Sequence, residues 1–226
     1  MSFQDSWYGE GEVFFIFIFM KTIAIKIGSS VILTGRNKLD EFRIAHIADQ
    51  VASLRKGGVG VVLVISGAVA FGANYIDLSE ADTRLKKVAA GIGQTYLISI
   101  VRKFFSAKKL TVAQVLLTKG CFYSKENQKS IKETLEYYLE IGIIPVINEN
   151  DVVDLNSFGG NDCLVSEIAT MLGLEQVIIL SQMSASLHGV GGGKIKQQVI
   201  TDLNNKGIRA SILNGKEKKN ITSNIL

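Results

Sequence analysis

The run VGVVLVIS at residues 59–66 most strongly limits the folds open to this chain. It has no charged side chain and no alternation between apolar and polar residues, so a strand formed from it is buried on both faces. Strands of that kind are typical of parallel sheets that helices cover on both sides. The run therefore predicts an interior strand of a parallel sheet.

The remaining chain alternates similar apolar runs with longer helical patterns. Strands are predicted at residues 22–28, 59–66, 111–117, 143–150, 176–181 and 208–215. Helices are predicted at residues 38–56, 79–106, 124–142, 161–173 and 194–206, with a tight turn into a helix at GAVAFG. We expect Asn161 or Asp162 to cap the helix at 161–173, and Gly173 to end it. This order predicts an α/β protein, a three-layer α/β/α sandwich with a mainly parallel central sheet.

Composition excludes several classes of protein. With 47% hydrophobic and 20% charged residues, the 226-residue chain suits one globular domain. The net charge of +4 is mild, and the basic cluster GKEKKN has no interleaved aromatic residues, so no nucleic-acid partner is expected. The two cysteines form no CxxC pair and the two histidines no HExxH pattern. Neither a disulfide framework nor protein metal ligands are expected. A cytoplasmic location is expected.

The N-terminus carries an apolar run at residues 13–20, followed by the strand pattern KTIAIKIGSS. The run is shorter than the roughly 20 residues of a membrane helix, and acidic residues before it do not suit a signal peptide. We expect residues 1–19 to be a weakly ordered extension or an added edge strand, and residues 20–226 to form the domain. A membrane anchor is the less favoured alternative, so no membrane partner is expected.

Four polar or glycine-rich loops follow predicted strands: KIGSS, SGAVAFG, NENDVVDLNSFGGND and LSQMSASLHGVGGGKIK. Ligands of parallel sheets bind beyond the carboxyl ends of the strands, so these loops are expected to converge on one site. Lys26 lies inside an apolar run, where its charge is costly unless it meets an anion. With the backbone amides of Gly28, Ser29 and Ser30 it could hold a phosphate. The alternative is a lysine that reaches solvent from an edge strand.

The segment GVGGGKIK at residues 189–196 has four glycines and two lysines, which suits a phosphate-binding loop. It fits neither GxxxxGK[ST] nor GxGxxG, so both common nucleotide motifs are excluded.

These motifs, in this order, resemble those of the amino acid kinase family, and within it the glutamate 5-kinase group. IKIGSS is similar to the family's VKxGSS, SGAVAFG to SGAxxxG, and AAGIGQ to AAxGQ. INENDVV is similar to INENDxV, and FGGNDCLVSEIA to FGDNDxLSAxVA. The resemblance covers about residues 21–215 and implies the amino acid kinase fold.

The resemblance implies the phosphorylation of the γ-carboxylate of L-glutamate by ATP with Mg²⁺, the first step of proline biosynthesis, in a homo-oligomer. The implied catalytic residues are Lys26, Asp162 and Lys196. The implied glutamate-binding residues are Ser66, Gly67, Asp151 and Asn161. The implied nucleotide-binding residues are Lys26, Gly28, Ser29, Ser181, Gln182, Val190, Gly191, Gly192, Gly193, Lys194, Ile195 and Lys196. Of the two loop lysines, Lys196 is expected to act and Lys194 to be solvated.

Departures from the family pattern include one on the glutamate side, where Gly160 implies the loss of a polar contact, and more on the nucleotide side. Gly160 stands where the family has an acid, Gln182 replaces an aspartate, and a long segment before the glycine loop is missing. We expect weaker contacts to adenine and ribose, with phosphate contacts retained. The alternatives are a catalytically impaired relative that binds an amino acid or a partner, and a kinase of another small carboxylate or phosphate.

Overall fold

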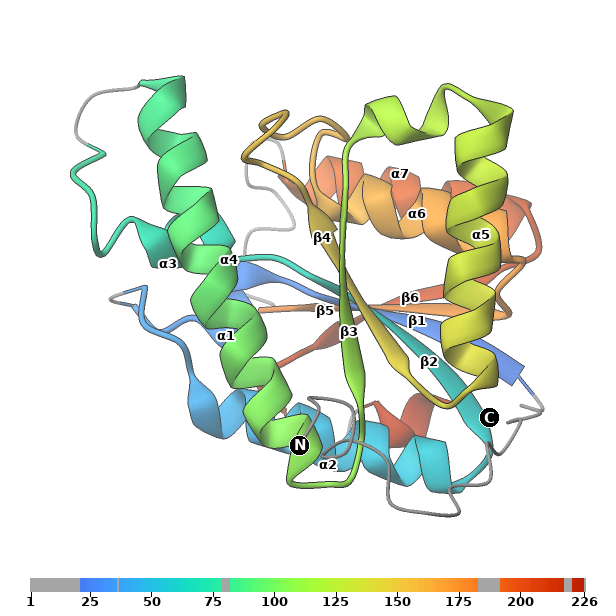
Figure 1. The fold of residues 1–226 in the computed structure, drawn as a ribbon. Coiled ribbons are helices and arrows are strands. Elements are labelled where there is room, and N and C mark those ends of the chain that lie inside the picture. The colour runs from blue at the N-terminus through green and yellow to red at the C-terminus, as the bar shows by residue number, and fades with distance from the viewer. Residues whose placement is uncertain (1–20, 36, 79–81, 183–191, 218–220, 226) are drawn as a thin grey trace, which may run out of the picture.

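A parallel sheet of six strands forms the centre of the computed structural model, which describes residues 21–35, 37–78, 82–182, 192–217 and 221–225 (Figure 1). The strand order is β3-β4-β2-β1-β5-β6, and all neighbouring strands of this sheet are parallel. The strands are β1 (Lys21–Ile27), β2 (Val59–Ile65), β3 (Val112–Leu117), β4 (Ile144–Glu149), β5 (Gln176–Ser181) and β6 (Arg209–Asn214). The prediction of a parallel α/β protein is confirmed.

Helices cover both faces of the sheet. They are α1 (Ser29–Ile32), α2 (Glu41–Lys56), α3 (Ala68–Gly72), α4 (Thr83–Ser106), α5 (Lys125–Glu140), α6 (Asn161–Leu172) and α7 (Gly192–Asn205), with 3₁₀ helices η1 (Lys119–Phe122) and η2 (Thr222–Asn224). Side chains of α1, α2 and α4 pack on one face in one apolar cluster, and those of α5, α6 and α7 pack on the other face in a second. The three-layer sandwich follows from these two clusters (Figure 1).

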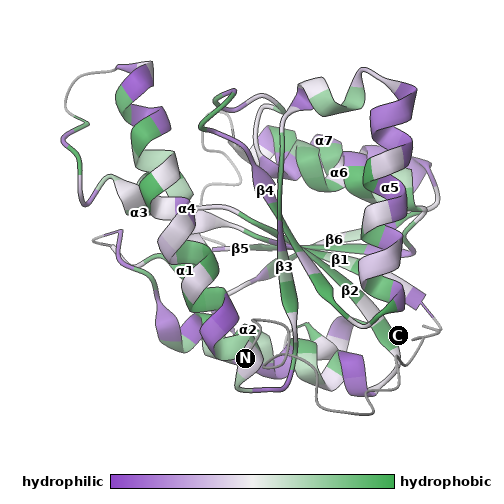
Figure 2. Cartoon of the chain, in the orientation of Figure 1, coloured by the Kyte–Doolittle hydropathy of each residue, from purple (hydrophilic) through white to green (hydrophobic). Residues whose placement is uncertain are grey.

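The strand β1 shows how the sequence produces the two clusters. Ile23, Ile25 and Ile27 belong to the first cluster, whereas Ala24 between them belongs to the second. Successive side chains of a strand point to opposite faces, so an apolar run feeds both layers. Figure 2 shows the central strands apolar along much of their length, with polar residues on the helices around them.

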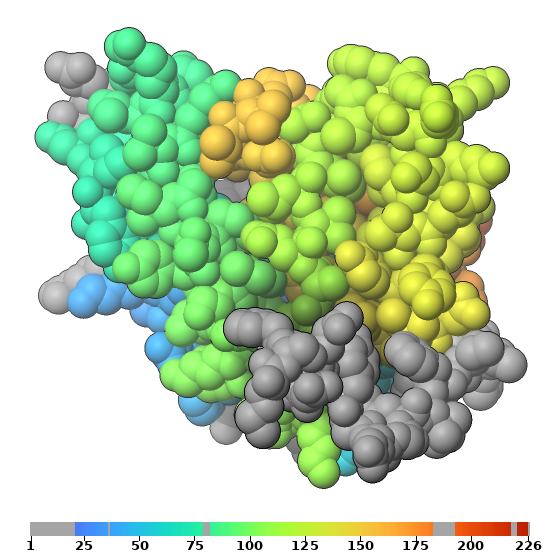
Figure 3. Space-filling model, in the orientation of Figure 1, coloured from blue at the N-terminus to red at the C-terminus, as the bar shows by residue number. Residues whose placement is uncertain are grey.

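The edge strand β3 lies at the surface between α4 and α5 (Figure 3). Most of its residues are half-buried, in contrast to the fully buried β2. None of the described helices combines the length and apolar character that crossing a membrane requires.

Most element boundaries lie within a few residues of their prediction, and α6 gives the main correction. Its N-cap is Gly160, and no side chain caps the helix. The prediction of a cap at Asn161 or Asp162 is therefore wrong, whereas Gly173 ends the helix as predicted, with a φ of 62°. The short helices α1, η1 and η2 were not predicted. The predicted N-terminal extension, residues 1–19, lies outside the described residues, so its prediction stays untested.

Candidate functional site

Lys26 lies on β1, which is an interior strand between β2 and β5. Lys26 is only 5% exposed, and its Nζ lies 2.7 Å from Oδ1 of Asp162, the second residue of α6. The alternative of an edge-strand lysine that reaches solvent is therefore wrong. The ion pair with the Asp162 carboxylate offsets the free-energy cost of burying the Lys26 charge.

Lys196 approaches the same carboxylate from α7. Its Nζ lies 3.4 Å from Oδ2 of Asp162, so one buried carboxylate stands between two ammonium groups. Burial lowers the pKa of Lys26, Asp162 opposes that shift, and the charge of Lys196 adds to it. Two cations that share one anion leave a net positive charge, which favours binding of a further anion.

The turn after β1 differs in part from its prediction. The backbone N–H of Gly28 donates to Leu180 O at 3.0 Å. The prediction that this N–H is available to a phosphate is therefore wrong. A Cβ on Gly28 would lie 3.1 Å from that same oxygen and 3.8 Å from Lys26 Nζ. Glycine therefore lets the turn pack closely on β5 and leaves space beside the ammonium group. Ser29 follows as the first residue of α1 and is half-buried.

The end of β5 lies beside this turn. Gln182 donates its backbone N–H to Ser30 Oγ at 3.4 Å, and Ser181 accepts a bond from Gly215 N. Ser181 is half-buried and Gln182 is exposed. Ser181 and Gln182, the two residues expected beside the nucleotide, thus lie at the same carboxyl end of the sheet as Lys26.

The glycine-rich segment is described only from residue 192 onward, where α7 begins. Val190 and Gly191 lie outside the described residues. Lys194 is exposed, as predicted. The remaining predicted residues of this segment, Gly192, Gly193 and Ile195, form the first turn of α7 with it. Helical spacing therefore separates the two lysines, and only Lys196 reaches Asp162.

Asn161 turns inward at the start of α6 instead of capping it. Its Nδ2 carries two N–H groups and lies within hydrogen-bond distance of three acceptors, Ile65 O at 3.1 Å, Ser66 Oγ at 2.9 Å and Asn148 Oδ1 at 2.8 Å. A backbone carbonyl accepts only, so the amide nitrogen must face Ile65. The buried Asn161 Oδ1 has no donor among the described residues. It is a free acceptor, and a ligand N–H could satisfy it.

Three residues of this site were missed as functional candidates. Asn148 is buried; its Nδ2 donates to Gln94 Oε1 at 2.7 Å, and its Oδ1 accepts from Glu149 N at 2.9 Å. These bonds fix the Asn148 amide that orients Asn161. The three missed residues are Gln94, in the motif AAGIGQ, and Asn148 and Glu149, in the motif INENDVV. The motifs do not reveal that Gln94 and Asn148, which are 54 residues apart in the sequence, form a hydrogen bond.

Glu149 shapes the loop between β4 and α6. Its buried carboxylate accepts the backbone N–H of Phe158 at 3.1 Å and also that of Gly160. Burial raises the pKa of Glu149, the two N–H bonds oppose that rise, and the charges of Asp151 and Asp154 add to it. Burial also raises the pKa of Asp151, whose Oδ1 accepts from Asn156 N at 2.8 Å.

The four expected substrate residues line one cavity of about 290 Å³. These residues are Ser66, Gly67, Asp151 and Asn161. The cavity lies beyond the carboxyl ends of β2 and β4, next to Ser29 and Glu149. Its size suits a small metabolite better than a drug-sized ligand. The site thus places amides and carboxylates on the substrate side, and two lysines on the anion side.

Gly160 also lines this cavity, at a φ of 115° and ψ of 158°. Only glycine adopts this conformation without strain. The family resemblance implies a lost polar contact here, because the family has an acid at this position. The backbone here additionally requires glycine, so the change in residue and the shape of the loop go together.

Magnesium was expected together with the nucleotide. No group of three or more metal-ligating side chains lies together in the described parts of the chain. Mg²⁺ does not need such a group, because it is commonly held by substrate phosphates and water with at most one or two carboxylates. A Mg²⁺ ion brought by the nucleotide would be held in that way.

Comparisons with known proteins agree on one family. Residues 21–212 match the family model described as the amino acid kinase family. Glutamate 5-kinase of Thermus thermophilus is 41% identical over 169 residues, which are 73% of this chain and 45% of that protein. Glutamate 5-kinase 2 of Bacillus subtilis is 34% identical over 174 residues, 75% of this chain and 47% of that protein. The chain thus spans about half the length of the curated relatives it matches.

Solved structures show the same architecture. Isopentenyl phosphate kinase of T. acidophilum superposes with a TM-score of 0.64 at 15% identity, over 86% of this chain and 91% of that chain. A second isopentenyl phosphate kinase structure gives a TM-score of 0.63 at 18% identity, over 89% of this chain and 94% of that chain. At these identities the likeness is one of fold.

Proposed function

Because the chain belongs to the amino acid kinase family, we propose that it transfers the γ-phosphoryl group of ATP to the γ-carboxylate of L-glutamate. The observation that carries the proposal is the buried Asp162 held between Lys26 and Lys196, beside the cavity that Ser66 and Asn161 line. The names of the relatives, glutamate 5-kinases, support glutamate as the substrate.

The two lysines act on the phosphoryl group. An oxygen of the substrate carboxylate forms a bond to the γ-phosphorus while the bond from that phosphorus to the ADP oxygen breaks, and ADP leaves. Lys26 and Lys196 stabilise the charge on the equatorial phosphoryl oxygens, and Asp162 keeps both ammonium groups aimed at that point. A carboxylate is already ionised at neutral pH, so no general base is required.

The cavity residues act on the amino acid. An ammonium group of the substrate can donate to the carboxylate of Asp151 and to the free Asn161 Oδ1, while the Ser66 hydroxyl remains available to a carboxylate oxygen. Positioning both reactants in this way supplies much of the rate enhancement. Glu149 acts through the loop that it holds and is a positioning residue.

The nucleotide binds, in this proposal, against the turn at Ser29, the end of β5 and the start of α7. Mg²⁺ carried by the phosphates supplies further charge neutralisation. We also propose a homo-oligomer in the cytoplasm, which the family resemblance favours.

The test is a direct assay of the purified protein with ATP, Mg²⁺ and L-glutamate. Glutamyl phosphate is trapped with hydroxylamine as the hydroxamate while ADP release is followed. We expect hydroxamate with glutamate and none with aspartate, acetylglutamate or a nucleoside monophosphate. ADP release with one of these instead would support the kinase of another substrate. No product at millimolar ATP would favour the catalytically impaired relative.

The pH dependence of the reaction should reflect Lys26. Only the ammonium form of Lys26 stabilises the phosphoryl group, and folding lowers its pKa below the ordinary lysine value of 10.5, chiefly through burial. At saturating glutamate, kcat/KM for ATP should therefore fall as the pH rises through a pKa below 10.5. In the residual activity of Lys26→Arg this alkaline fall should move to higher pH, because arginine stays charged. An unchanged profile would assign the fall to another group.

A further inference from the structure

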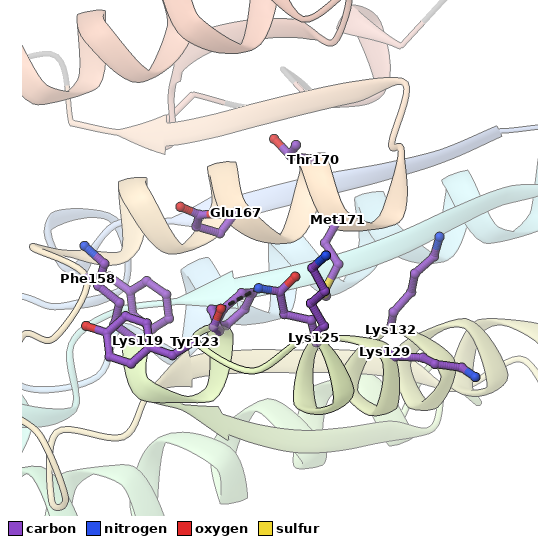
Figure 4. A pocket seen from close by; sticks show the side chains of 11 residues that line it. Lys119, Tyr123, Lys125, Lys129, Lys132, Phe158, Glu167, Thr170 and Met171 are labelled. Carbon is purple, nitrogen blue, oxygen red and sulfur yellow. Dashed lines mark hydrogen bonds between the residues drawn. The ribbon is translucent and has the colours of Figure 1, made fainter.

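A larger cavity, of about 590 Å³, lies outside the candidate site, between α5 and α6 (Figure 4). We call it the lysine groove. Residues of η1 and α5 form one wall, and Glu167, Thr170 and Met171 of α6 stand on the opposite wall. Phe158, from the loop between β4 and α6, completes its end.

Four lysines line the lysine groove, from η1 and α5: Lys119, Lys125, Lys129 and Lys132. The three on α5 are spaced by four and three residues, so they occupy one face of that helix. Among the described residues that line the groove, Glu167 alone is acidic. Lys206, the residue that follows α7, donates from Nζ to Thr170 Oγ1 at 3.2 Å. The walls thus carry a clear excess of positive charge.

Intrachain carboxylates neutralise this charge only in part. Lys129 and Lys132 have contacts of 3.7 Å to acidic residues one turn further along α5. Neither Lys119 nor Lys125 has a carboxylate within ion-pair distance in the described part of the chain. Lys125 is the first residue of α5, where the helix dipole disfavours a cation, and Lys129 follows at the repelling i+4 position. A bound anion would relieve these repulsions.

The floor of the lysine groove is apolar. Phe122 and Phe158 meet edge to face, with ring centroids 5.4 Å apart, and Met171 of α6 also lines the lysine groove. Gln128 of α5 donates to the Phe122 carbonyl and so fixes η1 against the helix. Aromatic rings and a methionine below a rim of lysines suit a ligand with one charged and one apolar end.

We propose that the lysine groove binds a small anionic ligand that carries a phosphate or carboxylate on an aromatic or similar apolar body. The anionic group lies among the lysines of the rim, which include Lys119 and Lys125, and the apolar body rests on Phe122 and Phe158. The occupant touches the loop of the candidate substrate cavity, since Phe158 also donates its backbone N–H to Glu149. This site is separate from the one that Lys26 and Lys196 form.

The test uses phenyl phosphate as the probe, in calorimetric titrations of the full chain. We expect saturable binding that weakens by at least about tenfold in Lys119→Gln/Lys125→Gln, because the two rim lysines without a carboxylate partner lose their charge. Lys56→Gln/Lys109→Gln removes the same charge from exposed positions at the other end of the sheet and should bind like the unchanged protein. A Lys26→Met protein should retain the binding, which separates the lysine groove from the candidate active site.

Two further probes test the two ends of the ligand. Inorganic phosphate and benzyl alcohol should each bind at least about tenfold more weakly than phenyl phosphate, since each lacks one half of the contacts. A concentration of about 10 mM probe is high enough to detect even affinities much weaker than those of specific sites. If no saturable binding is seen at that concentration, the proposal is overturned. Equal affinity in the Lys119→Gln/Lys125→Gln protein would overturn it too, as would phosphate that binds as tightly as phenyl phosphate.

Discussion

Replacement of Lys26 by methionine should reduce the rate of phosphoryl transfer by roughly a hundredfold to a thousandfold, the usual cost of one donor to the transition-state charge. Methionine has a similar length and is apolar, so it suits a position that is 5% exposed on an interior strand. Asp162 would keep Lys196 at 3.4 Å, so no unpaired buried charge is created. The fold should therefore survive while the chemistry fails.

Comparison with Lys56→Met makes that result specific. Lys56 is an exposed lysine at the end of α2, and its replacement changes net charge equally. Its kcat should stay within about twofold of the unchanged protein. The measurement is kcat and KM for ATP in both variants, with circular dichroism as the check on folding. A folded Lys26→Met protein that keeps a tenth or more of the activity would rule out Lys26 as the main phosphoryl-stabilising residue.

The order of strands and helices was predictable because each strand is an apolar run and several helices end at glycine. Gly173 and Gly142 have φ values of 62° and 82°, the conformation in which glycine is favoured. The strand order was not available from such local patterns. Whether Lys26 is buried depends on β1 lying between β2 and β5, and that arrangement is set by packing between distant segments.

The residue types of the candidate site were predictable, but the directions of their side chains were not. Asn161 is a residue type that is common at N-caps. Its side chain instead contacts acceptors on β2, on the turn after β2 and on β4. Gly28 has the composition of a phosphate-binding turn, yet its N–H is taken by β5. In both cases a long-range hydrogen bond decides against the local preference, and a single sequence does not encode that choice visibly.

Two glycines of the family-like motifs have a role that sequence alone did not assign. Gly72 ends SGAVAFG, and Gly93 lies in AAGIGQ. A Cβ on Gly72 would lie 1.9 Å from Ala89 O, and one on Gly93 would lie 1.8 Å from Ala68 O. The backbones of α3 and α4 are therefore in direct contact, and the motifs preserve helix packing behind the substrate cavity.

Replacement of Gly93 by alanine should destabilise the protein by about 3 kcal/mol or more, at the upper end of overpacking effects. The obstacle is backbone, so neither helix can yield without moving Ala68 and the adjoining turn at Ser66. For a chain of this size the melting temperature should fall by roughly 6–12 °C, and KM for glutamate should rise as the cavity shifts.

Gly91→Ala is the matched control for this prediction, because it lies in the same helix two residues earlier. Its Cβ would meet only Val152 Cγ2, at an ordinary 3.5 Å. Alanine there should gain roughly 0.5–1 kcal/mol from helix propensity, so thermal unfolding should occur at an equal or higher temperature than in the unchanged protein. If Gly93→Ala and Gly91→Ala had the same melting temperature, the backbones of α3 and α4 could not be in direct contact. The packing role proposed for both motif glycines would then be wrong.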